Sequence, residues 1–472
     1  MILFLILHIY FVSFLDRPEK TAPQLSERAW EQRAKWNIPT DGMDYPVSPT
    51  YQGQLRKMGV KIHHVSRWFN GATCEMDEET AAKVAELKFV TAVEMTREDE
   101  QEEPDPDGMN LSRRKRLVQA PAQDEFQNKE QLELYNLLPL HEAGFEGQGV
   151  LMAICDGGFY NANTVSFLRQ KELELGHFDF TDDADDFYGS TGEHGTNCLS
   201  TISGIDVSGD YYGAAPKAQY YLMRSEEDVT ESPKEMDNLV AALEKADSLG
   251  VNIFSISLGY ALFDNEAWNL THDDLDGRST RASLAATIAA RKGMLVCVAA
   301  GNEGDNTWRK ISVPADADSI LTVGAVDAEG DIADFSSYGP SADGRIKPEV
   351  CAVGWGACLI SPREKIIYSN GTSFATPLIA GMAACLWSAL PEENAMQIRE
   401  RIIRSSDRYL QPDNKQYGYG IPDAWAAYDR GQGLHNDELM KEEDTPKKIL
   451  RGEQILIIRH GHVYNLAGQM VE

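Results

Sequence analysis

Basic residues are scarce in this sequence relative to acidic ones. The chain of 472 residues holds 44 Lys and Arg against 74 Asp and Glu, a formal net charge of −30 at pH 7. A surface with this charge repels nucleic acid phosphates and anionic membranes. The composition therefore argues against nucleic acid as a partner.

Long apolar runs are also rare. The run MILFLILHIYFVSFL at the N-terminus is long enough for the core of a signal peptide and short for a membrane span. No Lys or Arg precedes it and no small-residue cleavage site stands out after it. We still expect residues 1–17 to be a signal peptide, with a misplaced chain start as the alternative. The expected location is secreted or at the cell surface, the periplasm and outer membrane included.

The number of cysteines is odd, whereas a disulfide framework within one chain needs an even number. There are seven, and an odd number cannot all pair within one chain. Four lie in apolar or small-residue runs, where a free cysteine behaves as a small hydrophobe. These four are Cys155, Cys198, Cys297 and Cys385. Cys351 and Cys358 lie close together along the chain, but spacing alone does not decide whether they are bridged.

Residues 18–125 form a small segment with its own apolar pattern, followed by a linker. Ala81, Val84 and Leu87 recur at helical spacing just before a β-rich stretch, which predicts a short helix running into a strand. Residues 104–124 are charged, contain proline and lack periodicity, as linkers do. We expect a small α+β domain joined to the rest by this linker.

Residues 130–430 alternate buried-looking strands with helical patterns. GVLMAICD, GVNIFSISLG and GMLVCVAAGN are short, apolar and bounded by Gly, Asp or Asn, as strands buried on both faces are. Ser232, Pro233 and Glu235 form a capping box that starts a helix, and Gly250 stops it. Since parallel strands need helical crossovers, the pattern predicts an α/β domain on a largely parallel sheet.

Four polar residues stand where such a sheet carries chemistry, at or near the carboxyl ends of its strands. Asp156 and Asn302 each follow a buried strand, His194 opens a helix, and Ser373 opens the apolar helix of YSNGTSFATPLIAGMAACLW. Taken singly, Asp156 and Asn302 have a plainer interpretation as turn residues, and His194 as a structural or solvated histidine. Together they would make one site.

The motifs around these residues resemble those of the subtilisin-like serine peptidases, family S8. NGTSFATPLIAG is similar to their serine motif, EHGTNCLSTISG to their histidine motif, AICDGGF to their aspartate motif and AAGNEG to their oxyanion motif. The order Asp, His, Ser is the subtilisin order. The resemblance covers roughly residues 135–428 and implies a three-layer subtilisin-like α/β fold with a mostly parallel central sheet, preceded by a small α+β prodomain.

The resemblance implies a role for each residue. Ser373 would be the nucleophile, His194 the general base and then acid, and Asp156 the group that orients and stabilises the imidazole. Asn302 and the backbone amide of Ser373 would stabilise the oxyanion. Two positions depart from the family pattern: Gly157 replaces a Thr or Ser, and Glu193 replaces a Gly.

Two segments are implied to line the substrate pocket and to pair with a peptide through their backbones. Their residues are Ser257, Leu258, Gly259, Ala299, Ala300 and Gly301. Val313–Pro314 falls where relatives carry a cis bond. No cofactor and no metal-binding residue is predicted, although the acidic stretch DFTDDADDFYG makes structural calcium a candidate.

The resulting hypothesis is an exported serine endopeptidase that forms an acyl-enzyme, acts on peptides or proteins, and is made as a self-processing zymogen inhibited by its own prodomain. The alternative is a non-catalytic binding or surface protein that retains the fold. Residues 431–472 form a C-terminal tail whose HVYNLAGQMVE end resembles the sorting tails that a Bacteroidetes secretion machinery recognises. A hairpin that docks on the main domain is the alternative for this tail.

Overall fold

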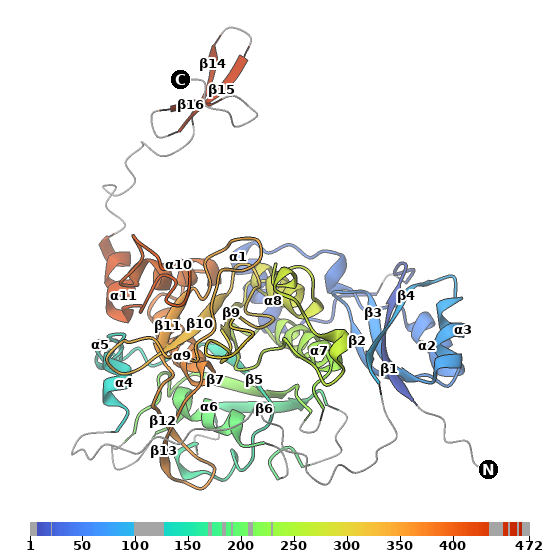
Figure 1. Cartoon of the computed structure of the whole chain (residues 1–472), viewed down its shortest axis with the longest axis horizontal. Coiled ribbons are helices and arrows are strands. Elements are labelled where there is room, and N and C mark those ends of the chain that lie inside the picture. Colours follow the sequence, from blue (N-terminus) through green and yellow to red (C-terminus); the bar gives the residue numbers. More distant parts are fainter. Residues whose placement is uncertain are drawn as a thin grey trace. The chain divides into compact units, whose positions relative to one another are not determined.

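The computed structural model describes residues 7–19, 21–98, 127–168, 172–181, 186–189, 192–205, 211–227 and 230–433, together with three strands between residues 447 and 464. The chain forms two compact units, Met1–Ala427 and Tyr428–Glu472. The first unit contains an N-terminal domain around a four-stranded sheet and a main domain around a seven-stranded sheet (Figure 1).

The N-terminal domain is an antiparallel sheet in the order β2-β3-β1-β4. Helices α2 and α3 cover one face, where Leu55 and Val84 pack with Tyr10 and Val12. The other face lies against α7 of the main domain. The elements are β1 (His8–Phe14), α1 (Glu27–Trp36), α2 (Pro49–Lys57), β2 (Lys61–Ser66), β3 (Gly71–Met76), α3 (Glu78–Ala85) and β4 (Val90–Arg97).

Strand β1 corrects the prediction of a signal peptide over residues 1–17. It is an inner strand, hydrogen-bonded to β3 on one side and β4 on the other. Tyr10 and Val12 face the helices, while the ring of Phe11 lies 4.3 Å from the guanidinium carbon of Arg281 in the main domain. Because both faces are covered, the strand is mostly apolar and has a sequence similar to the core of a signal peptide.

The sheet of the main domain has the order β11-β10-β9-β8-β5-β7-β6, and every pairing in it is parallel. This confirms the predicted α/β class. Its strands are β5 (Leu151–Asp156), β6 (Glu174–Asp179), β7 (Gln219–Arg224), β8 (Ile253–Ile256), β9 (Leu295–Ala299), β10 (Leu321–Val326) and β11 (Val350–Val353). A separate two-stranded sheet pairs β12 (Ala357–Ile360) with β13 (Ile366–Ser369).

Helices cover both faces of this sheet. Ala153 and Cys155 of β5 pack in a core with residues of α7 and α8, whereas the equally buried Met152 and Ile154 point to the opposite face. Helices α6 and α9 pack together over that second face. The helices are α4 (Lys129–Glu133), α5 (Leu138–Glu142), α6 (His194–Ser203), α7 (Pro233–Leu249), α8 (Arg281–Arg291), α9 (Thr372–Ala389), α10 (Ala395–Ser405) and α11 (Ala424–Gly433).

The predicted helix signals are confirmed in α7 and α9. Helix α7 begins at the Ser232 capping box and ends at Gly250, whose φ of 75° is left-handed. Helix α9 is long and apolar enough to cross a membrane, but 89% of it is buried inside the protein. It is the core helix of the domain, and a Cβ at Gly381 would lie 2.6 Å from the Cβ of Ala214.

Two further expectations have clear outcomes. All seven cysteines are free and buried, so Cys351 and Cys358 are not bridged. The Val313–Pro314 bond is cis.

The second unit contains an antiparallel sheet of β14 (Lys447–Arg451), β15 (Gln454–Arg459) and β16 (His462–Tyr464). The predicted strands of the tail therefore form. The residues of the candidate sorting signal that follow Tyr464 lie outside the described residues.

Strand β1 gives a testable prediction. Val12→Asp places a carboxylate in a fully buried position and should destabilise the N-terminal domain by more than about 3 kcal/mol. The matched control is Leu15→Asp, one residue beyond the strand and 63% exposed. Thermal unfolding of the two full-length chains measures the difference. Equal melting temperatures of the Val12→Asp and Leu15→Asp chains would contradict a buried strand and favour a signal peptide at this position.

Candidate active site

Asp156 is the last residue of β5 and is completely buried. Its Oδ1 accepts a hydrogen bond from the backbone amide of Gly157 at 2.8 Å and lies 2.7 Å from Nδ1 of His194. An ionised carboxylate only accepts, so Nδ1 carries the proton and Nε2 is left free to act as a base. Gly157 stands where the family has a Thr or Ser and so has no hydroxyl. Its backbone amide still donates to the Asp156 carboxylate.

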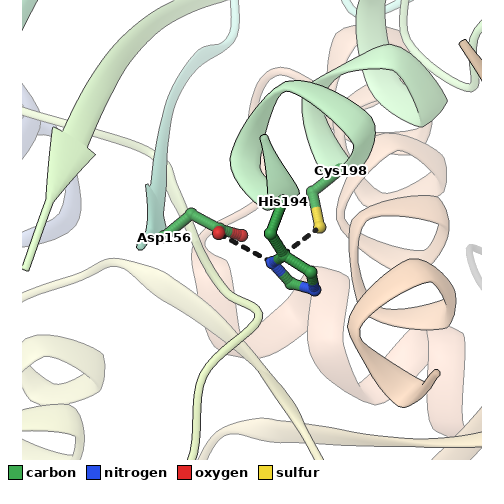
Figure 2. A group of neighbouring side chains, drawn as sticks. All are labelled: Asp156, His194 and Cys198. Carbon is green, nitrogen blue, oxygen red and sulfur yellow. Dashed lines mark hydrogen bonds and ion pairs between the residues drawn. The ribbon is translucent and has the colours of Figure 1, made fainter. Parts of the chain in front are cut away.

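His194 reaches this carboxylate because α6 approaches the end of β5 very closely. The amide of Gly195 donates to the carbonyl of Gly158 at 2.9 Å, and a Cβ at Gly195 would lie only 2.5 Å from that oxygen. Only glycine permits this approach. Figure 2 shows the result: the His194 ring at the start of its helix, turned toward Asp156 at the end of the strand.

The electrostatics of the pair favour a charged imidazole. Burial of the ring disfavours the charge and alone would lower the pKa of His194. The Asp156 carboxylate outweighs burial, so the pKa of His194 lies well above its usual value. The side chain of His194 remains 33% exposed, which leaves one edge accessible.

Cys198 lies one turn along α6 from His194 and links the histidine to α9. Its Sγ is 3.8 Å from Nδ1 of His194 (Figure 2). The same thiol donates to the carbonyl of Ser373 at 3.3 Å. Burial raises the pKa of this thiol, so it stays protonated. The sequence predicted a core thiol, and the structure adds that this one touches both His194 and Ser373.

Ser373 is the second residue of α9 and is 8% exposed. Its hydroxyl donates to the carbonyl of Ser257 at 3.1 Å, and the Ser257 hydroxyl donates to the carbonyl of Ser373 at 2.8 Å. The ring of Phe374 lies 5.5 Å from that of His194. The start of α9, with the positive end of its helix dipole, therefore lies near the histidine, while the Ser373 hydroxyl bonds to Ser257.

Asn302 is held by a residue that sequence reasoning did not single out. The amide and hydroxyl of Thr372 both donate to Oδ1 of Asn302, at 2.9 and 3.0 Å. Because a backbone amide can only donate, the atom facing it must be the oxygen, and the side-chain NH₂ points elsewhere. Thr372 stands inside the serine motif, so its position beside Ser373 was the available signal.

The two predicted pocket walls differ in their backbones. The amide of Ala300 donates to Val323 and its carbonyl accepts from Ser312, so this residue has no backbone group left for a peptide. The amide and carbonyl of Gly301 are also used, by Thr372 and Ser337. Ala300 and Gly301 can form a wall, but their amides and carbonyls are already bonded within the domain.

The other wall differs. Among the described residues, the backbones of Leu258 and Gly259 make no hydrogen bond, which leaves this segment as an available edge.

Metal binding at the predicted acidic stretch cannot be assigned to described groups, because residues 182–185 lie outside the described residues. Two described groups of side chains could reach one ion. One is Asp156, His194 and Cys198, whose thiol and imidazole are poor ligands for calcium; the other is Glu226, Glu231 and Glu235. Structural calcium stays a prediction, and no chemical step depends on it.

Comparison with known proteins identifies the family of this chain. The model of the family described as "Subtilase family" matches residues 147–420, more than half of the chain. The chain belongs to the subtilase family. A second family, "Peptidase S8 propeptide domain, Bacteroidota", matches residues 9–108, so the N-terminal domain of this subtilase is its propeptide domain. The protein is thus a serine-type peptidase made with a propeptide.

Several named peptidases are similar to this subtilase. Serine protease AprX of Bacillus subtilis is 30% identical over 312 residues, which cover 59% of this chain and 66% of AprX. Subtilisin DY of Bacillus licheniformis is 30% identical over 290 residues, 60% of this chain and 92% of the relative. Subtilisin E of Bacillus subtilis is 26% identical over 378 residues, 79% and 84% of the two chains.

Solved structures support the fold. The MycP3 protease from the type VII (ESX-3) secretion system matches with a TM-score of 0.52 and 22% identity, over 66% of this chain and 91% of its own. MycP1 from Mycobacterium smegmatis matches with a TM-score of 0.52 and 21% identity, over 66% and 87%. The subtilase therefore has the fold of these proteases.

The raised pKa of His194 predicts a shifted pH dependence. If neutral His194 is the base, a raised pKa keeps the ring charged to a higher pH, and activity should be lost on acidification through an apparent pKa above about 6.5. The pH profile of kcat/KM on a chromogenic peptide measures it. A profile that stays flat down to pH 5 would contradict both the role of His194 as the base and the raised pKa of its side chain.

Asn302→Ala tests the oxyanion assignment. A donor aimed at the developing oxyanion acts mainly in the transition state, so kcat should fall and KM should change by less than about threefold. The expected fall of about 10²- to 10³-fold is borrowed from a measurement on a subtilisin, a relative of this chain. Steady-state hydrolysis measures both constants.

The control is Asn306→Ala, an asparagine in the following turn whose Oδ1 accepts from the amide of Trp308 at 2.8 Å. This variant should keep the original kcat. An unchanged kcat in Asn302→Ala would mean that Asn302 only shapes its turn.

Proposed function

We propose that this subtilase hydrolyses internal peptide bonds of proteins through an Asp156, His194 and Ser373 triad and an acyl-enzyme. The observation that carries the proposal is the 2.7 Å contact between Asp156 and Nδ1 of His194; Ser373 opens α9, and the ring of the next residue, Phe374, lies 5.5 Å from that of His194. The rival role of a retired peptidase fold has no observation in its favour, since all four predicted groups are present.

The chemistry follows from the proton positions. Nε2 of His194 takes the hydroxyl proton as Oγ of Ser373 attacks the carbonyl carbon, and Asp156 stabilises the resulting imidazolium. The collapsing tetrahedral intermediate expels the amine, which receives that proton from Nε2. Water then repeats the sequence on the ester: His194 takes a proton from the water, the acid product leaves, and the proton returns to Ser373.

The oxyanion of each intermediate would be stabilised by two donors. One is the NH₂ of Asn302, left free because Thr372 holds the oxygen of the same amide. The other is the amide of Ser373, in the first turn of α9, where amides lack partners within the helix. Both donors belong to fixed elements, so little reorganisation is needed during the reaction.

Substrate would bind as a strand along residues 257–259. Within the described part of the chain, the backbones of Leu258 and Gly259 make no hydrogen bond, and the carbonyl of the neighbouring Ser257 accepts from the Ser373 hydroxyl; residues 299–301 would close the pocket as a wall. Recognition through the backbone favours extended chains over particular side chains. The proposed substrate is therefore an unfolded or flexible protein segment.

The remaining parts of the proposal concern maturation and export. The propeptide domain would inhibit the enzyme until the linker, within residues 99–126, is cut by the enzyme itself. Export to the cell surface or beyond would rest on the C-terminal tail, through its resemblance to sorting tails. The linker and the residues after Tyr464 lie outside the described residues, so these steps stand on the sequence.

Ser373→Ala tests self-processing and catalysis together. Without the nucleophile the chain should remain at full length and release no product from a peptide substrate. The control is Ser388→Ala on the same helix, whose hydroxyl donates only within the helix to Cys385. Intact-mass measurement of the purified chains gives the termini. Identical cut termini in wild type and Ser373→Ala would show that another protease makes the cut.

A further inference from the structure

The propeptide domain touches the peptidase domain with more than its sheet. Between β1 and α2 the chain leaves the sheet and runs along the peptidase domain as a segment, residues 26–44, that we call the arm. It contains α1 and a short 3₁₀ helix, Gly42–Asp44. The amide of Ser26 donates to the carbonyl of Ser248 at 2.8 Å, so the arm starts at the end of α7.

The arm binds the edge of the sheet opposite to the active site. Arg28 donates to the carbonyl of Gly250 at 3.0 Å and to Oδ1 of Asn252 at 2.7 Å, just before β8 begins. Asp156 ends β5, and Ser257 follows β8. Since the strands are parallel, their amino ends, where the arm lies, and their carboxyl ends, where the site lies, are at opposite edges. The arm therefore cannot act by blocking the site.

A chain of buried charges ties the arm to the peptidase domain. Lys292 contacts Asp44 at 2.9 Å, Asp44 contacts Arg33 at 2.6 Å, and Arg33 contacts Asp247 at 2.8 Å. Arg67, from the turn between β2 and β3, contacts the same Asp247 at 2.6 Å. All five side chains are at most 11% exposed.

The chain of charges ends at Glu244 on α7. This carboxylate accepts from the hydroxyl of Ser66 at 2.6 Å and from the amides of Arg67 and Trp68 at 2.9 and 3.1 Å. Three cations, Arg33, Arg67 and Lys292, thus meet three carboxylates across the interface. Losing one member would leave a buried charge without its partner, which is far more costly than losing an exposed pair.

The propeptide domain also contacts the opposite edge. Arg97, the last residue of β4, contacts Glu227 at 2.6 Å, and Glu227 follows β7 at the carboxyl end of the strands. The propeptide domain therefore contacts the peptidase domain near both edges of the seven-stranded sheet. Cutting the linker breaks the covalent connection between the two domains and leaves both the Arg97–Glu227 contact and every contact of the arm in place.

We propose that the arm is a second docking element, which keeps the severed propeptide bound to the peptidase domain from the edge opposite the active site. The surface it fits consists of the end of α7, the start of β8 and Lys292. It recognises a short helix that presents two arginines. This inference rests on the proposed function only in taking a cut within residues 99–126 as the event that precedes release.

The test uses the full chain with Ser373→Ala and a protease recognition sequence inserted after residue 108. The chain is immobilised through a tag at its C-terminus and cut completely by the added protease. The released propeptide fragment is then followed over time in the wash by mass spectrometry. Because the cut is made by an added protease, the result does not depend on whether the chain is itself an active peptidase.

Arg33→Met should release the fragment at least about tenfold faster, because it leaves Asp247 and Asp44 each short of one partner in a buried place. Arg28→Ala should also accelerate release, and it tests the arm should Arg33→Met fail to fold. The matched control is Glu27→Ala on the same helix, an exposed residue whose side chain makes no hydrogen bond or ion pair with the described part of the peptidase domain.

The control should release the fragment within about twofold of the unsubstituted chain. Release from Arg33→Met and Arg28→Ala at the rate of the control would overturn the proposal, as would immediate release from the unsubstituted chain. Unfolding of the uncut chains, followed by circular dichroism, establishes which variants are folded before cutting.

Discussion

Parallel pairing of the seven strands is the constraint on which the rest of this molecule depends. Because all strands point the same way, every residue that follows a strand arrives at one edge of the sheet. Asp156 after β5, Ser257 after β8 and Asn302 after β9 are far apart in sequence and meet there. Helices then return the chain to the amino edge. Because the proposed active site lies at the carboxyl edge, the amino edge can bind the arm.

The chemistry depends on how closely helices approach that edge. Gly195 lets α6 come within hydrogen-bonding distance of Gly158, which brings the imidazole to the carboxylate. Thr372 at the start of α9 fixes which end of the Asn302 amide faces the cleft. Gly195 and Thr372 have no proposed catalytic role themselves, but they determine the positions of His194 and Asn302.

Helix α7 serves two purposes through its two faces. Its apolar side, with Leu239 and Leu243, belongs to the core of the peptidase domain. Its other side presents Glu244 and Asp247 to the propeptide domain, where they are buried against arginines. These carboxylates would be exposed to water if the two domains were apart. In this chain they are buried in the interface between the propeptide and peptidase domains.

Local patterns in the sequence were sufficient for the fold class and for choosing the candidate residues of the site. Strands with apolar runs, the capping box of α7 and the serine motif at α9 each depend on neighbours within a few residues, so they can be recognised in one dimension. The order of Asp156, His194 and Ser373 along the chain carried the family resemblance as well.

Contacts between distant segments decided what the sequence could not. The apolar run at His8–Phe14 is a strand and not a leader because helices cover one face and the peptidase domain the other, and a buried strand and a signal core need the same residues. The backbone of Ala300 is unavailable because Val323 and Ser312 reach it. The arm finds its place through Asp247, more than two hundred residues after Arg33. Burial and hydrogen bonding between remote segments exist only in the folded chain, which is why tertiary structure alone determined them.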